Sequence, residues 1–408
     1  MTTPAGEMSV RRLGQAPHRL LFFIGGTNLL LAMAWWAAWL LAQRIPALAM
    51  PAPATPMVGG WVHAFVMQYQ VLPSFMAGFL LTVFPRWMAL PEVPLWRYAP
   101  VGIGLFGGQI ATLAGAMGWP SGFMVGLFMT LAGWIALLAT LGPLVWRDRS
   151  SNWHARSIYL ALVLGLCGLL AHAAYSFGAS PLWELASIKI GTFGLLLPVY
   201  LTVAHRMFPF FASGVVSGYI PWRPYHLLVS AWLLIALQLG LELFHAYRWL
   251  WAADLGLLAL SLTMCWRWWP RAPMPGLLRV LFLGLAWLPV AFSLYASQSV
   301  IYLFTGAFPL GRAPAHALFI GFFGSVLVAM VTRVTRGHSG RPLLMPPVAW
   351  FAFVAIQVVT VIRVGAEFSR DPLPWHALAA IGWVVALAPW ALSCARTYLA
   401  ARVDGKPG

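Results

Sequence analysis

The chain has 408 residues, of which 61% are hydrophobic and only 8% are charged, and its net charge at pH 7 is +16. A soluble domain carries charge on roughly a quarter of its residues, so this composition excludes an ordinary soluble enzyme and indicates a membrane protein. An outer-membrane barrel is excluded too, because its strands show about ten residues of alternating polarity. The apolar runs here reach the length of about twenty residues that a spanning helix needs.

Twelve such runs predict an all-α, polytopic membrane protein with about twelve transmembrane helices. Short cytoplasmic loops of these proteins collect Lys and Arg. If both termini are cytoplasmic, nineteen of the 25 Lys and Arg residues lie in inner segments and five in outer ones. The positive charge then lies against anionic lipid and does not indicate nucleic-acid binding. The predicted spans are 20–41, 58–84, 98–117, 121–145, 156–178, 184–205, 225–246, 249–267, 278–305, 314–335, 346–365 and 374–397.

The longest connections between these runs lie at about 42–57, 146–156 and 206–224. None is long enough for a folded soluble domain, so we expect residues 1–408 to form a single transmembrane domain. The first run exceeds the core of a signal peptide, which predicts an uncleaved first helix. The three cysteines are far apart in the sequence, which argues against a disulfide or a zinc ribbon.

Histidine is the most informative residue type, because polar groups within a bilayer usually mark function. The predicted topology sorts the ten histidines by depth. Three of them, His18, His154 and His226, fall in inner loops, where contact with headgroups or water explains them. The outer layer contains His63, His172, His245, His316 and His376, and the inner layer contains His205 and His338.

A metal or a haem iron is the usual reason to collect imidazoles. His63 begins the second span, and Met67, Gln70 and Ser74 follow at helical spacing, which predicts one polar, ligating stripe. Ordinary helix packing is the alternative. His316 begins the tenth span and is followed by small residues at four-residue steps, a pattern that admits a neighbouring helix or a flat ring.

His63 and His316 begin two spans of the same direction at similar depth, so both could reach one haem iron from opposite sides. His316 and His338 are 22 residues apart, or about 33 Å along a straight helix, and are too distant to share a metal. We therefore expect His338 to belong to a separate inner site with His205 and Arg206, or to no site.

The tenth span ends in the sequence TRVTRGHSGRPL at 332–343. Its three arginines orient the helix and suit a lipid phosphate, a haem propionate or another bound anion. Gly337 and Gly340 are expected to end the helix before Pro342. The cationic residues of this segment are Arg333, Arg336 and Arg341.

Three segments resemble the NnrS family of membrane proteins of the nitrosative-stress response. The most specific is HALFIGFFGSVLVAMVTRVTRGHSGRPL, from His316 to Leu343. The others are PSFMAGFLLTVFPRW at 73–87, which follows His63, and AHRMFPFF at 204–211. They lie in or just after the second, sixth and tenth spans, and so they are spread through most of the chain.

The resemblance implies a twelve-helix bacterial inner-membrane protein that contains haem, expected to be of b type, and copper, and that responds to nitric oxide. It implies cofactor roles for His63, His205, His316 and His338. Many family members have His-x-His-Glu-Met at the start of the second span, whereas this chain has HAFVM at 63–67 and lacks one His and the Glu. This departure argues against a ligand set that needs both.

Twelve spans with intramembrane histidines also occur in haem–copper oxidases and nitric oxide reductases, but those enzymes need an adjacent His-His pair, which this chain lacks. The second, sixth and tenth spans are four apart, which would suit a threefold repeat of four-helix units.

Three ionisable residues, Lys189, Glu242 and Asp254, fall inside spans, where mutual neutralisation is favoured slightly over a proton path.

The sequence is compatible with three hypotheses for the function. The leading hypothesis is a haem and metal protein of nitric oxide tolerance that binds nitric oxide or a related small ligand, or converts it as an oxidoreductase. The second is a transporter of a small solute or metal complex, for which Pro73, Pro198 and Pro289 would break helices. The third is a membrane sensor that signals through its basic inner face. An electron donor and an oligomeric state do not follow from the sequence.

Overall fold

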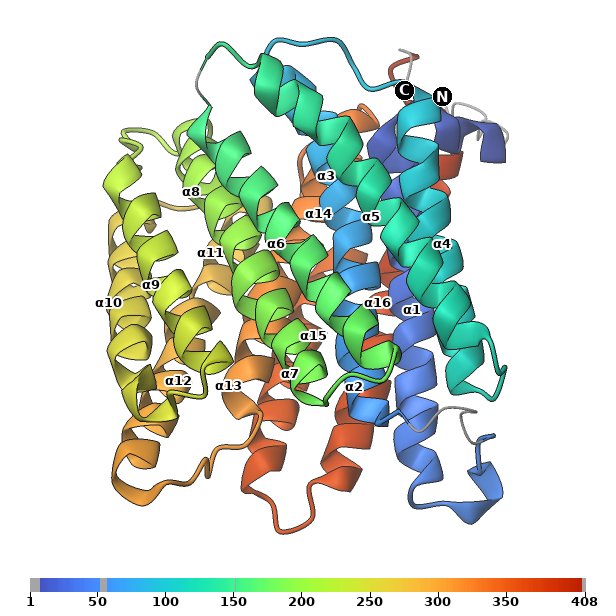
Figure 1. The fold of residues 1–408 in the computed structure, drawn as a ribbon. Coiled ribbons are helices and arrows are strands. Elements are labelled where there is room, and N and C mark those ends of the chain that lie inside the picture. The colour runs from blue at the N-terminus through green and yellow to red at the C-terminus, as the bar shows by residue number, and fades with distance from the viewer. Residues whose placement is uncertain (1–7, 52–56, 151, 406–408) are drawn as a thin grey trace. The chain divides into compact units, whose positions relative to one another are not determined.

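The computed structural model describes residues 8–51, 57–150 and 152–405. The described residues form helices and no strands, and twelve helical spans are long and apolar enough to cross a membrane (Figure 1). The predicted all-α polytopic fold is therefore confirmed. The spans are Pro17–Ala42, Gly59–Trp87, Leu95–Ala116, Gly122–Arg147, Trp153–Ser176, Leu182–Ser213, Tyr225–Leu243, Tyr247–Trp268, Gly276–Thr305, Ala313–His338, Pro347–Phe368 and Leu373–Leu399.

The chain divides into two compact units, which are described separately. Unit 1 comprises residues 1–188, 331–343 and 387–408, and unit 2 comprises residues 189–330 and 344–386. Three of the helical spans, beginning at Leu182, Ala313 and Leu373, contribute residues to both units. The two units therefore share continuous helices.

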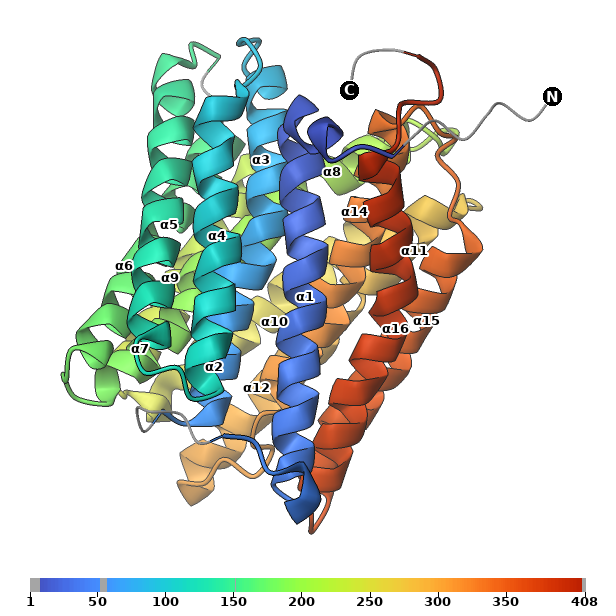
Figure 2. The same ribbon diagram turned by 90° about the vertical axis from the view of Figure 1, so that its right-hand side faces the viewer.

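In unit 1, helices α4 (Leu95–Ala116) and α5 (Gly122–Arg147) pack closely because glycines meet at their interface (Figure 2). A Cβ on Gly104 would collide with the backbone of Gly133, and a Cβ on Gly122 would collide with the backbone of Gly115. Lipid provides no hydrophobic force between helices, so such close backbone approach is the main source of their attraction. The other helices that begin in unit 1 are α1 (Pro17–Ala42), α2 (Gly59–Phe65), α3 (Leu72–Trp87), α6 (Trp153–Ser176) and α7 (Leu182–Lys189).

In unit 2, two successive side-chain hydrogen bonds join three helices. The indole of Trp287 donates to Gln357 Oε1 at 2.5 Å, and Gln357 Nε2 donates to Ser325 Oγ at 2.8 Å. These bonds satisfy polar groups that lipid would leave without partners. The helices of this unit are α8 (Leu197–Ser213), α9 (Tyr225–Leu243), α10 (Leu250–Trp268), α11 (Gly276–Leu285), α12 (Trp287–Thr305), α13 (Ala313–His316) and α15 (Pro347–Gly365), with parts of α14 (Ser325–His338) and α16 (Leu373–Leu399).

The second, sixth and tenth spans share one local architecture. Each begins with a short α-helix, continues through a π-helical segment and ends with a longer α-helix. The three π-helical segments are η3 (Val66–Val71), η4 (Ile190–Leu196) and η6 (Ala317–Gly324). This recurrence supports the expectation that the chain repeats at an interval of four spans.

The same three spans are also the most buried ones. In their most apolar windows 89%, 72% and 78% of the residues are buried, whereas no other span exceeds 61%. The side chains of a helix that is buried on most of its surface can form a site that is shielded from lipid and water.

In unit 1, the first and last described segments of the chain lie together. The backbone N–H of Ser9 donates to the carbonyl of Leu399, and the N–H of Val403 donates to the carbonyl of Ser339. The guanidinium of Arg19, near the start of α1, donates to the carbonyls of Tyr398 and Ala400, both at 2.9 Å. The start of α1, the end of α14 and the end of α16 therefore meet at one end of this unit (Figure 1).

Candidate functional site

His63 lies in α2, immediately before a π-helical segment, and its side chain is half-buried. The imidazole stacks on the indole of Trp36, with ring centroids 4.6 Å apart and planes inclined by 10°. Trp36 in turn stacks on Trp39 at 5.0 Å, so the histidine extends an aromatic column along α1. The column fixes the plane of the His63 ring.

The sequence predicted a ligating stripe that continues from His63 along the same helix. This prediction is wrong for Gln70 and Ser74. Gln70 is fully buried and donates to the hydroxyls of Thr112 and Thr130, on α4 and α5, at 3.0 and 2.9 Å. Ser74 donates to the carbonyl of Gln70. His63 instead faces Trp36 on α1. The cause is the intervening π-helical segment, whose wider turn breaks the 3.6-residue register on which the stripe depended. Met67, a predicted ligand, lies half-buried within that segment.

His316 ends α13 and directly precedes the π-helical segment η6. Its Nδ1 donates to the carbonyl of Arg312 at 3.0 Å, because a carbonyl can only accept. The bond holds a proton on Nδ1, so a neutral His316 ring has its lone pair on Nε2, where it could bind a metal.

The small residues after His316 serve helix packing. A Cβ on Gly321 would collide with the indole of Trp287, and Ser325 lies against Gly284 while it accepts a hydrogen bond from Gln357. The packing interpretation of this stripe is therefore the one that the structure supports. Because His63 belongs to unit 1 and His316 to unit 2, their pairing across one iron stays a prediction.

His205 is buried in α8, in unit 2, and its Nε2 donates to the carbonyl of Pro224 at 3.1 Å. The edge of the ring meets the indole of Trp268, with centroids 6.0 Å apart. The next residue, Arg206, is half-buried, and its carbonyl accepts a hydrogen bond from Arg223. His338 belongs to unit 1, so the predicted inner site that joins it to His205 also stays a prediction.

The end of the tenth span has the predicted cap with one correction. Gly340 is left-handed, with φ of 74°, and the N–H of Arg341 reaches back to the carbonyl of Arg336 at 3.0 Å. This is the bond of a Schellman cap, for which glycine is favoured. Gly337 lies inside the last turn of α14 and does not end it. Arg336 also donates through Nε to the carbonyl of Pro342, and Arg333 is half-buried.

His338 lies next to His18, a residue for which the sequence predicted no cofactor role. His18 was expected in an inner loop, but it lies in the first turn of α1 and is only 2% exposed. The two imidazole centroids are 4.4 Å apart, and Arg86 Nη1 lies 3.4 Å from His338 Nε2. His154 was also expected in a loop and is buried in α6. Depth alone could not reveal these contacts, because the partners are far apart in the sequence.

A buried His–Glu pair in unit 1 was also missed. His172 Nδ1 lies 2.6 Å from Glu184 Oε2, and both side chains are at least 95% buried. Phe65 stacks on the same imidazole at a centroid distance of 3.9 Å. The signal in the sequence was Glu184 itself, an acidic residue at the start of an apolar span.

The ionisable residues that the sequence placed within spans of unit 2 are paired in part. Lys189 Nζ lies 2.9 Å from Glu242 Oε1, which supports mutual neutralisation over a proton path for these two. Asp254 is buried beside Ser299, and its Oδ1 has no hydrogen-bond partner among the described residues.

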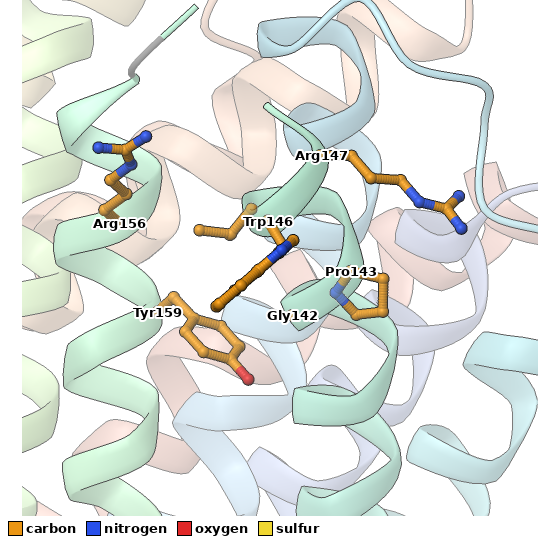
Figure 3. A pocket seen from close by; sticks show the side chains of 7 residues that line it. Gly142, Pro143, Trp146, Arg147, Arg156 and Tyr159 are labelled. Atoms are coloured by element: carbon orange, nitrogen blue, oxygen red, sulfur yellow. The ribbon is translucent and has the colours of Figure 1, made fainter. Parts of the chain in front are cut away.

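An open cleft in unit 1 lies between α5 and α6. Figure 3 shows the rings of Trp146 and Tyr159 between Arg147 and Arg156, with Gly142 and Pro143 alongside. None of the predicted cofactor residues lines this cleft, so it does not form the candidate cofactor site.

Among the described residues, no group of three or more His, Cys, Asp and Glu side chains is placed to hold a metal ion. The profile of one protein family, described as "NnrS protein", matches residues 12–402 of the chain. No curated protein matches the chain. The match includes all three segments that carry the π-helical turns, and the chain therefore belongs to the NnrS family.

Proposed function

We propose that this protein holds a haem within a bacterial inner membrane and acts in nitric oxide tolerance, by binding nitric oxide or by redox chemistry at the iron. One observation carries the proposal. The three most buried spans contain the family segments, and in each span a π-helical turn follows His63, Lys189 or His316 within three residues. π-Helical turns are rare and frequently occur at functional sites.

The donor atoms of His316 fit an axial haem ligand. Its Nδ1–H is held by a backbone carbonyl, which leaves the lone pair on Nε2 and fixes the ring orientation. His63 has a fixed ring plane through its contact with Trp36. These two residues would hold the iron, singly or as a pair, and Met67 is a further soft donor beside His63.

Copper fits less well. A copper centre built from three or more His, Cys, Asp or Glu ligands has no counterpart among the described residues.

A bound haem would supply the iron that binds nitric oxide and exchanges one electron. The chain would supply the surroundings. Apolar side chains of the most buried spans exclude water, and half-buried Lys189 balances the charge of buried Glu242. The His172–Glu184 pair is held at 2.6 Å between Nδ1 and Oε2. The contact gives each of these two buried polar groups a partner that lipid could not provide.

Axial-ligand variants test the proposal. His316→Ala and His63→Ala should each lower the haem content of the purified protein or change its axial-ligand absorption spectrum. His226→Ala is the matched control, because this exposed histidine lies at the start of α9 and is not a proposed ligand. Wild-type spectra and haem content in both ligand variants would refute the ligand assignment. A wild-type protein with neither haem nor iron would refute the proposed function and would favour a transporter.

A further inference from the structure

A cluster of basic side chains in unit 1 has no role in the proposed haem site. We call it the His18–His338 cluster, and it brings together segments that are far apart in the sequence. The start of α1, the end of α3 and the end of α14 meet there, beside the last residues of α16. Its members are His18, Arg19, Arg86, His338 and Arg341.

Two contacts define the centre of the cluster. The imidazoles of His18 and His338 lie 4.4 Å apart between centroids, and Arg86 Nη1 lies 3.4 Å from His338 Nε2. Arg19 and Arg402 lie within electrostatic range of both imidazoles, and Arg341 lies within electrostatic range of Arg19. Cationic side chains therefore surround the two histidines from several segments.

The carboxylates nearby do not balance this charge. Glu92 lies 3.6 Å from Arg86, but its side chain is 81% exposed. Asp404 pairs with Arg402 at 2.7 Å and so balances only that one arginine of those within electrostatic range of the imidazoles. Arg19 is buried and donates to two backbone carbonyls of the carboxyl-terminal segment. The described carboxylates thus leave the cluster with a surplus of positive charge.

Two buried polar atoms of the cluster also lack a partner. His18 is 2% exposed, and its Nδ1 makes no hydrogen bond within the described part of the chain. The same is true of Arg341 Nη1. Burying a polar atom without a partner is unfavourable. The Arg341 guanidinium can only donate, and a neutral imidazole can carry its proton on Nδ1, so both atoms suit a ligand that accepts hydrogen bonds.

We propose that the His18–His338 cluster binds a phosphate group. A cation would be repelled by the arginines, whereas an anion is attracted by them. Guanidinium groups bind phosphate oxygens through two parallel N–H donors, and imidazole N–H groups can complete the set. The cluster lies where three spans end, so the phosphate belongs either to a lipid headgroup or to inorganic phosphate in the adjoining water.

The test uses full-length protein in phosphatidylcholine nanodiscs. Inorganic phosphate is titrated by calorimetry at constant ionic strength, and retention of phosphatidylglycerol is followed by native mass spectrometry. Arg86→Gln is the first variant, because this side chain is 56% exposed and its replacement leaves the core intact. His338→Gln is the second. Each should weaken binding of the phosphate-bearing probe about tenfold to a hundredfold, as expected for loss of a charged hydrogen bond.

Arg149→Gln is the matched control, because it removes one exposed positive charge from the α5–α6 loop of the same unit and leaves the cluster unchanged. Weaker inorganic phosphate binding in the cluster variants alone would assign the site to soluble phosphate. Loss of phosphatidylglycerol alone would assign it to lipid. A wild-type protein that binds neither probe, or cluster variants that match Arg149→Gln within twofold, would overturn the proposal. Neither result depends on haem content, so this proposal and the proposed function fail separately.

Discussion

The His172–Glu184 pair shows how a single acidic residue can shape the interior of a membrane protein. Glu184 is fully buried, its Oε2 lies 2.6 Å from His172, and its Oε1 has no hydrogen-bond partner among the described residues. In a low-dielectric interior, a carboxyl group with one partner depends strongly on that partner. The pair is therefore expected to stabilise the fold.

We expect Glu184→Ala to lower the free energy of unfolding by about 3–5 kcal/mol, because it leaves the buried imidazole of His172 without its partner. Unfolding of the detergent-solubilised protein by heat or denaturant measures the change. Glu92→Ala is the control, and its effect should stay below about 0.5 kcal/mol because this side chain is 81% exposed. The double variant with His172→Ala should cost much less than the sum of the two single variants. Simple additivity would show that the two side chains do not interact.

Asp148, in the loop after α5, is a residue whose charge stabilises a connection. Burial by itself would raise the pKa of Asp148, but hydrogen bonds from Ser150 and Asn152 outweigh burial and lower the pKa below 3.8. A depressed carboxyl pKa contributes stability above the pKa of the unfolded chain. That contribution is lost as the pH falls through the pKa of the folded protein.

Asp148→Asn should therefore lower the free energy of unfolding by about 1 kcal/mol at pH 7, the usual effect of losing a charged hydrogen bond at a loop. The difference from wild type should shrink towards pH 3, where the wild-type carboxyl group begins to take up a proton. Unfolding transitions of both proteins at the two pH values give the comparison. A difference that is equal at both values would mean that the charge of Asp148 has no part in the effect.

At the scale of the element, the α4–α5 interface depends on the absence of side chains. Gly104→Ala would place a methyl group against the backbone of Gly133, which has no flexible end that could move. We expect a loss of about 1–3 kcal/mol in the free energy of unfolding, the typical effect of overpacking.

Gly240→Ala provides the matched control, since nothing lies within 4 Å of a Cβ at this helical position in α9. This change should be neutral or slightly stabilising, because alanine has the higher helix propensity. Equal effects of the two substitutions would contradict the assigned interface. Thermal unfolding of the two variants side by side decides the matter.

The elements differ in how far they could be predicted. The twelve spans follow from the sequence, because a helix must be about twenty apolar residues long to cross a bilayer. The π-helical segments do not follow from it. Segments such as Ala317–Gly324 are apolar on every side, so no contrast between polar and apolar faces reveals the wider turn. The stripe predicted from His63 to Ser74 failed because the π-helical segment Val66–Val71 lies within it.

Candidate site residues were chosen from local features of the sequence, and their cofactor roles stay predictions. His316 was chosen for its place at the start of a span, and its Nδ1 donates to the carbonyl of Arg312, four residues earlier. Contacts between distant segments were missed. The meeting of His18 with His338 depends on how α1 and α14 pack, and nothing in either segment alone encodes it.

At the scale of the whole molecule, the positive charge predicts the orientation in the membrane. Nineteen of the 25 Lys and Arg residues lie on one side of the predicted topology, which predicts that both termini are cytoplasmic. A green fluorescent protein fused to the carboxyl terminus should then fluoresce, and alkaline phosphatase fused at the same point should be inactive. The opposite pair of results would reverse the assigned orientation.

The proposed function depends on an intramembrane haem. The most direct test is to purify the full-length protein from cells supplied with iron and to measure its absorption spectrum and iron content. We predict a Soret band and iron in about stoichiometric amount with the haem. A preparation that is folded and helical, yet shows no Soret band and no iron, would contradict the account.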